Sequence, residues 1–146
     1  MSKARTPIQV VFDTNVIVSA LRSRHGASHK LLTLLGDGRW EINVSPALVL
    51  EYEEVAKRPA QELWANPSRV EDILDYLCAE SNKPRIYYTW RPALPDPDDD
   101  LVLELAVAAG AEFIVTHNVA DFKAAREFGI GILTPKAFLA LLKERT

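Results

Sequence analysis

The sequence predicts an α/β fold, a three-layer α/β/α sandwich with a central parallel sheet. Short apolar segments rich in β-branched residues alternate along the whole chain with longer segments of helical periodicity. Acidic residues follow several of the short segments, and a parallel sheet brings the carboxyl ends of its strands to one edge. A chain of 146 residues has the size of one domain. We therefore expect a single domain over residues 1–146, with a core of about residues 8–143.

Composition and charge narrow the class of protein. The net charge of −3 does not attract nucleic acid, so a nucleic-acid substrate would need a local basic patch or a metal ion. Cys78 is the only cysteine and cannot form an internal disulfide, which fits a reducing compartment. No segment approaches the ~20 apolar residues of a membrane span, and the N-terminal apolar run is too short for a signal peptide. We expect a cytoplasmic protein without a membrane association.

The strands and helices are predicted in order from these patterns. Helix starts are marked by a capping residue followed by proline, as in Ser45-Pro46, Asn66-Pro67 and Thr134-Pro135. Five β-rich runs predict strands at 8–12, 40–44, 86–90, 113–116 and 130–133. Helices are expected after Asp13-Thr14-Asn15, at 28–35, 45–58, 66–80, 101–110 and 123–128, and from 134 onward.

Four carboxylates crowd into residues 96–100 (DPDDD). Their mutual repulsion costs free energy unless a cation or a helix N-terminus compensates it. Between Leu101 and Ala109 only Glu104 is charged, and a helix that is apolar all round belongs inside a domain. Acid held at the rim of a core suggests a divalent cation. The alternative is a capped helix start with surplus solvated charge.

Further carboxylates should converge on the same place. Asp13 follows the first strand, where it could also simply cap a helix. Glu51 shares a helix face with Leu48 and Tyr52, and Asp121 follows the fourth strand. Together with Asp99, these side chains should lie at the carboxyl edge of the sheet. Such a cluster is typical of a Mg²⁺ or Mn²⁺ site that binds substrate phosphate, and it favours metal-assisted phosphodiester hydrolysis.

A basic loop lies between the first two helices. It carries Arg22, Arg24 and Lys30, together with two histidines, and contains no acidic residue. Two interpretations stay open: a solvated loop, or a loop that contacts substrate phosphates beside the first strand–helix junction.

Four segments, in this order, resemble the PIN-domain family: residues 10–16 (VVFDTNV), 44–51 (VSPALVLE), 96–100 (DPDDD) and 114–118 (IVTHN). The similarity runs from about residue 9 to residue 142, and the branch it resembles most is described as toxin components of bacterial toxin–antitoxin systems. The resemblance implies a central parallel sheet between helices and a Mg²⁺- or Mn²⁺-dependent endoribonuclease.

The resemblance also implies roles for single residues. Asp13, Glu51 and Asp99 match the first three acids of the family. Asp99 is preferred over Asp100 because the apolar residues and the helix-ending glycine then fall at the family's positions. Asp13 and Asp99 would hold the metal ion, and Glu51 would position the metal or the attacking water. The residues expected to orient ligands or substrate around them are Asn15, Thr116 and Asn118.

The fourth acid of the family is replaced here by Asn118. A variant within the family has asparagine there and an aspartate three residues later, before phenylalanine, and Asp121-Phe122 fits that pattern. Whether Asp121 replaces the missing carboxylate or caps its helix stays open at the level of sequence.

The family resemblance further implies a cognate antitoxin protein that blocks the acidic groove, for example by presenting an arginine, and homodimers are common in the family. The main alternative is a non-catalytic PIN-fold binding protein with a degenerate site, which the fold equally allows. Phosphatases that form an aspartyl-phosphate are disfavoured, because they need a second aspartate where Asn15 stands.

Overall fold

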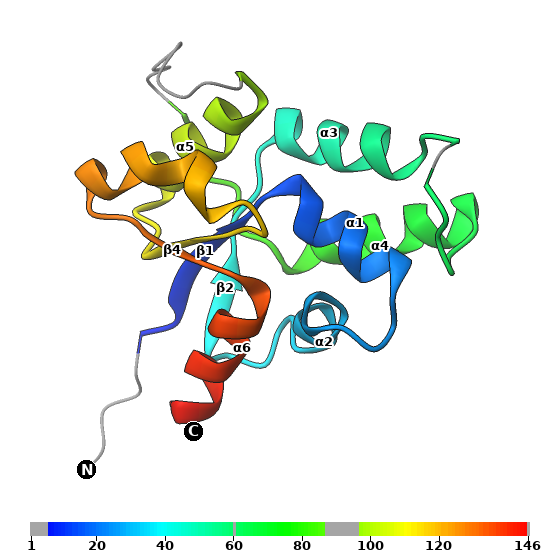
Figure 1. Ribbon diagram of the computed structural model, residues 1–146, viewed down its shortest axis with the longest axis horizontal. Helices are drawn as coiled ribbons and strands as arrows, with labels where there is room; N and C mark the ends of the chain where they lie inside the picture. The colour runs from blue at the N-terminus through cyan, green and yellow to red at the C-terminus, as the bar shows by residue number, and fades with distance from the viewer. Residues whose placement is uncertain (1–5, 60, 87–96, 146) are drawn as a thin grey trace.

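The computed structural model describes residues 6–59, 61–86 and 97–145, and it contains a parallel sheet between helices (Figure 1). The sheet has the strand order β2-β1-β3-β4. All three pairings are parallel, with Val10 opposite both Ile42 of β2 and Phe113 of β3. The strands are β1 (Ile8–Phe12), β2 (Trp40–Ile42), β3 (Phe113–Val115) and β4 (Gly131–Leu133).

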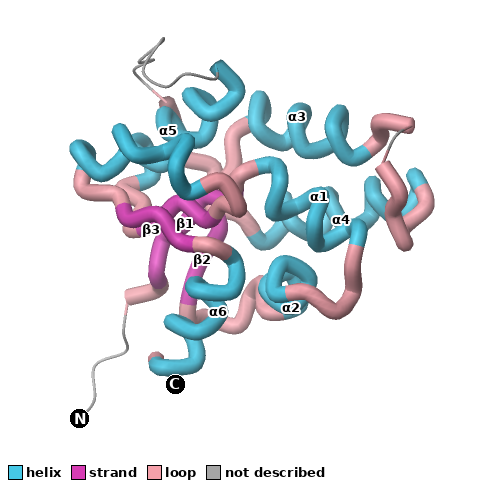
Figure 2. The backbone as a smooth tube through the Cα atoms, in the orientation of Figure 1, coloured by secondary structure: helices cyan, strands magenta, loops and turns pink. Residues whose placement is uncertain are grey.

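Helices connect these strands and cover the sheet. Figure 2 shows short strands at the centre with helices around them, as the sequence predicted. α5 packs against β1 and β3, whereas α6 packs against β4. In Figure 1, α5 lies above the strands, and α6 and α2 lie below them. The helices are α1 (Thr14–Arg22), α2 (Ala27–Thr33), α3 (Pro46–Ala56), α4 (Pro67–Glu80), α5 (Pro97–Ala109), the 3₁₀ segment η1 (Val119–Phe128) and α6 (Pro135–Glu144).

An aromatic cluster joins α6 to the sheet. Phe12 of β1 stacks on Trp40 of β2 with ring centroids 5.5 Å apart, and Phe138 of α6 meets Trp40 edge-on at 5.5 Å. All three side chains are buried. Since side chains alternate along a strand, Val11 points to the opposite face, which α5 covers. The central strand β1 is thereby fixed from both sides, and so is the residue that follows it, Asp13.

The helix starts follow from local sequence. Ser45, Asn66 and Thr134 accept hydrogen bonds from backbone N–H groups of the first turns of α3, α4 and α6, and each is followed by proline. Asp13 caps α1 in the same way. These four predicted capping positions are confirmed.

Three elements depart from their predicted ranges by more than two residues or fall largely outside the described residues. The helix expected at 101–110 begins earlier, at Pro97, so that Asp99 and Asp100 lie within its first turn. The helix expected at 123–128 is part of a 3₁₀ segment that starts at Val119 and is interrupted at Phe122. The strand expected at 86–90 falls, apart from Ile86, outside the described residues.

Candidate functional site

Asp13 lies at the junction of β1 and α1, and its carboxylate is held by three donors. Oδ1 accepts the backbone N–H of Thr14 at 2.8 Å, which is the cap of α1. Oδ2 accepts the hydroxyl of Thr116 at 2.8 Å and the side-chain amide of Asn15 at 3.2 Å. The residue is 7% exposed. Buried carboxylates need such donors, and here the donors also fix the direction in which the carboxylate points.

Thr116 connects the loop after β3 to this carboxylate. Its side chain is fully buried, and its hydroxyl donates to Asp13 while it accepts the backbone N–H of Asn118 at 3.0 Å and the amide of Asn15 at 3.4 Å. One donor and two acceptor positions are all that a hydroxyl offers, so this hydroxyl is fully used. Asn15 also accepts the backbone N–H of His117 at 3.2 Å. The β1–α1 junction and the loop after β3 are therefore joined into one polar network.

Glu51 reaches the same junction from α3. Its Oε2 accepts a short hydrogen bond from the hydroxyl of Thr14. The neighbouring residue Tyr52 is fully buried and donates its hydroxyl to the backbone carbonyl of Phe12, the last residue of β1. Burial, followed by the nearby charges of Asp13 and Glu51, raises the pKa of Tyr52 well above its ordinary value. The phenol therefore stays protonated and keeps α3 attached beside Asp13.

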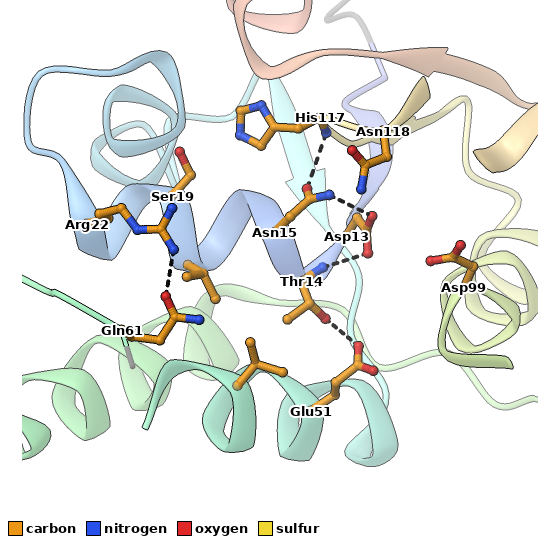
Figure 3. A pocket seen from close by; sticks show the side chains of 12 residues that line it. Asp13, Thr14, Asn15, Ser19, Arg22, Glu51, Gln61, Asp99, His117 and Asn118 are labelled. Atoms are coloured by element: carbon orange, nitrogen blue, oxygen red, sulfur yellow. Dashed lines mark hydrogen bonds between the residues drawn. The ribbon is translucent and has the colours of Figure 1, made fainter. Parts of the chain in front are cut away.

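Asp99 comes from the first turn of α5, on the other side of the junction. In Figure 3 its carboxylate faces Asp13 across the pocket. The side chain is half-buried, whereas Asp100 and Glu104 of the same helix are 1% and 3% exposed. Acidic side chains in the first turn of a helix are favoured by its dipole, which offsets part of their repulsion.

Asp13, Glu51 and Asp99 line one pocket with a cavity volume of about 530 Å³. We call Asp13, Glu51 and Asp99 its acidic end. Carboxylate oxygens are the donors that hard divalent cations prefer, so this end fits Mg²⁺ or Mn²⁺ by its chemistry. Within the described ranges, no three acidic, histidine or cysteine side chains form a complete ligand cluster. Mg²⁺ commonly binds through one or two carboxylates together with water and substrate phosphate, which is the arrangement that such a pocket can offer.

A family model described as PIN domain matches residues 9–120, which contain α3, α5, the loop after β3 and all of β1 except its first residue. The chain belongs to the PIN domain family. Its structure is similar to a chain in the crystal structure of VapBC2 from Rickettsia felis bound to a DNA fragment from their promoter. The TM-score is 0.60 at 18% identity, with 87% of this chain and 98% of that chain covered. At this identity the likeness shows the fold. A comparison with curated proteins finds no match.

The PIN domain brings most of the predicted site residues to the pocket. Asn15 and Asn118 line it beside Asp13, and Thr116 lies buried behind them. Arg22 lines the pocket as well. The assignment of roles to these residues stays a prediction.

Three predicted residues lie elsewhere. Asp121 is exposed in the first turn of η1 and is not among the residues that line the pocket. Arg24 places its guanidinium 4.4 Å from the ring centroid of Trp64, and Lys30 is exposed on α2. Of the three basic residues predicted to contact RNA, only Arg22, at the end of α1, lines the pocket.

Sequence reasoning assigned no role to four polar residues that line the pocket: Thr14, Ser19, Gln61 and His117. Thr14 and His117 stand inside the family motifs, so their position could have been anticipated. The ring Nε2 of His117 lies 3.4 Å from the hydroxyl of the buried Ser28 on α2. Gln61 follows α3 in a segment without a motif, and only the folded chain brings it to the pocket.

Among the helices that the structure describes, none combines the length and apolar character needed to cross a bilayer.

Proposed function

We propose that this PIN domain is a divalent-metal-dependent endoribonuclease and the toxin component of a toxin–antitoxin pair, acting in the cytoplasm. The observation that carries the proposal is the acidic end of the pocket. Three carboxylates from the β1–α1 junction, α3 and α5 line one cavity, and Asp13 among them is oriented by three hydrogen-bond donors. Like charges gathered in this way are stabilised by a cation, and a phosphodiester is the substrate class that such a site serves.

In this proposal Asp13 and Asp99 hold Mg²⁺ or Mn²⁺. The ion, when bound, supplies a water of lowered pKa and neutralises charge that develops on the phosphate. Glu51 lies beside them and accepts the proton of the attacking water at its carboxylate. The hydroxyl of Thr14 donates to Glu51 Oε2 and so fixes the orientation of that carboxylate.

The residues around the carboxylates bind and orient the substrate. Asn118, on the exposed side of the loop after β3, lines the pocket and can donate its amide to a phosphate oxygen. Asn15 and Thr116 keep Asp13 in place and join that loop to α1. The sugar and base then extend along the pocket, away from the acidic end.

The partner in this proposal is an antitoxin protein. The family resemblance implies such a partner, which blocks the acidic end, for example with an arginine. The similar structure from Rickettsia felis is described as VapBC2 bound to a DNA fragment from their promoter. A homodimer is a further expectation of the resemblance.

A second function is favoured by one observation, the presence of Asn118 where many PIN domains carry a fourth acid. It is a non-catalytic PIN-fold protein that binds RNA or a partner at the same pocket. The ribonuclease would cleave RNA with turnover, whereas the non-catalytic protein would bind it without cleavage.

A cleavage assay separates them. Wild type, Asp13→Asn, Glu51→Gln and Asp99→Asn are incubated with single-stranded RNA, with Mg²⁺, with Mn²⁺ and with a chelator. We expect metal-dependent cleavage by the wild type and a loss of at least a hundredfold in each variant. Asp75→Asn on the exposed face of α4 is the matched control and should cut at the wild-type rate. RNA binding without cleavage by the wild type would favour the non-catalytic protein.

A further inference from the structure

The end of the pocket opposite the carboxylates has a different chemistry. Arg22 and Gln61 line it, and two apolar side chains, Val18 and Val55, line the pocket as well. In Figure 3 the labelled side chains of Arg22 and Gln61 lie on one side, and those of Asp13, Glu51 and Asp99 lie on the other. We call Arg22 and Gln61 the donor end. The function proposed above uses the acidic end and leaves the donor end without a role.

The contact between Arg22 and Gln61 fixes what this end can bind. Arg22 Nη2 donates to Gln61 Oε1 at 2.6 Å. A guanidinium has only donors, so the carboxamide oxygen must face it, and the amide nitrogen must point elsewhere. In Figure 3 that nitrogen lies on the side of Gln61 that faces the carboxylates. The guanidinium and the amide thus present N–H donors, one of them charged, which suits an anion with several acceptor oxygens.

The donor end is held in place by the backbone. Arg22 is the last residue of α1. The segment after α3 is fastened to the same turn of α1 by Trp64, whose backbone N–H donates to the carbonyl of Leu21 at 3.2 Å and whose indole N–H donates to that of Ala20 at 3.0 Å. Arg24 covers the ring of this tryptophan. Gln61 is therefore carried on a segment that is tied to α1.

α1 also sets the distance between the two ends. Asp13 caps the N-terminus of α1, and Arg22 is its last residue. A helix of 9 residues is about 13 Å long. Helical side chains lean toward the N-terminus, so the head of Arg22 leans back toward the acidic end. One nucleotide, or two, fits between a phosphate at the carboxylates and an anion at Arg22. The net charge of −3 gives no general attraction for RNA, so a local cation must supply it.

We propose that Arg22 and Gln61 bind a backbone phosphate of the same RNA strand, one or two nucleotides from the bond that is cleaved. The inference rests on the function proposed above and adds a substrate subsite to it. Val18 and Val55 supply apolar surface for the nucleotide in between. The donor end then sets the register of the strand on the acidic end.

The test removes one phosphate charge at a time. Short RNA substrates with a single cleavage site carry a neutral methylphosphonate at the first or second linkage on either side of that site. Cleavage efficiency (kcat/KM) is measured for each with wild type, Arg22→Gln, Gln61→Ala and Arg58→Gln. Arg58 is the matched control, an exposed arginine in the same segment that pairs with Glu54. Gln61→Glu adds a negative charge beside Arg22.

We expect one methylphosphonate position to lower the wild-type efficiency about ten- to a hundredfold, the range of a charge-assisted hydrogen bond. Arg22→Gln should be slower on the unmodified RNA but insensitive to that position, and Arg58→Gln should behave as wild type. Gln61→Ala should lose part of the sensitivity, and Gln61→Glu should lose more activity than Gln61→Ala.

Several results would contradict the proposed phosphate subsite. One is a wild type that is insensitive at all four positions, as expected if the donor end instead takes a carboxylate of a protein partner. Another is an Arg22→Gln variant that remains as sensitive as the wild type. If the wild type cleaves no unmodified RNA at all, the proposed function itself fails, which is a different result from cleavage without phosphate sensitivity.

Discussion

The hydroxyl of Thr116 donates to Asp13 Oδ2 at 2.8 Å, although the two residues are 103 positions apart in the chain. Asp13 follows β1 and Thr116 follows β3, and these strands are neighbours in the sheet. The pairing of two strands therefore sets the orientation of the carboxylate on which the proposed site depends.

Thr116→Val tests this relationship. Valine keeps the shape of the side chain but removes the donor to Asp13 and the acceptor for the backbone N–H of Asn118. We expect a loss of about 1–3 kcal/mol in the free energy of unfolding and at least a tenfold loss of RNA cleavage. Thr116→Ser keeps the hydroxyl and should retain most of the activity. Equal activity of the valine variant and the wild type would show that this hydrogen bond does not orient the site.

The hydrogen bond from the Thr14 hydroxyl to Glu51 offers a second test. Thr14→Val removes the hydrogen bond to Glu51 Oε2 and leaves the carboxylate in place. If Glu51 accepts a proton from the attacking water, the variant should lower kcat more than it raises KM, and Glu51→Gln should lower kcat further. Thr14→Val and Glu51→Gln are compared with the wild type by steady-state kinetics on one RNA substrate. A rise in KM alone would assign Glu51 to substrate binding.

Tyr52 makes stability depend on pH in the alkaline range. Burial and the neighbouring carboxylates raise its pKa in the folded protein above the ordinary value of 10.0. The folded state keeps the proton that the unfolded chain loses, so the stability that this phenol contributes is complete below pH 10 and falls as the pH rises further.

Tyr52→Phe should therefore be less stable than the wild type by about 1–2 kcal/mol at neutral pH, since the donor to the Phe12 carbonyl is lost. The difference between the two proteins should shrink above pH 10, by up to about 1.4 kcal/mol for each pH unit. Denaturant unfolding at pH 7 and above pH 10 measures it. A difference that does not change with pH would contradict the account.

Asp121→Asn distinguishes the two roles that the sequence left open. A fourth catalytic acid would make the variant lose cleavage without losing stability. A first-turn acid of η1 would make it lose about 0.3–1 kcal/mol of stability and keep its activity. Its exposed position away from the lining of the pocket favours the second outcome, which cleavage and unfolding measurements on the same sample would report.

Much of this architecture could be read from local patterns. The apolar run at β1 ends at Asp13, and Asp13 and Asp99 line one pocket. The strand expected before Asp99 falls outside the described residues apart from Ile86, and Asp121, which the same edge rule placed with them, does not line the pocket. The helix caps followed from Ser-Pro, Asn-Pro and Thr-Pro pairs. Such features depend on neighbouring residues, and the sequence displays them directly.

Other features depend on contacts that no local pattern records. Arg22 and Gln61 are 39 positions apart and meet in a folded chain in which α3 packs against α1 and Trp64 attaches the segment after α3 to α1. α5 starts at Pro97, before the apolar periodicity that predicts a helix from Leu101, because a proline at the first helical position and acids in the first turn are both favourable.

Thermal unfolding of wild type and Asp99→Asn with and without Mn²⁺ or Mg²⁺ tests the central claim, that the acidic end of the pocket holds a divalent cation, most directly. A ligand at ~100 times its Kd that binds only the folded state stabilises it by about 2.7 kcal/mol, which raises the unfolding midpoint by several degrees. We expect this rise in the wild type and little or none in Asp99→Asn, with the two proteins of similar stability when no metal is added. An equal response of both proteins to the metal, or no response in either, would contradict the account.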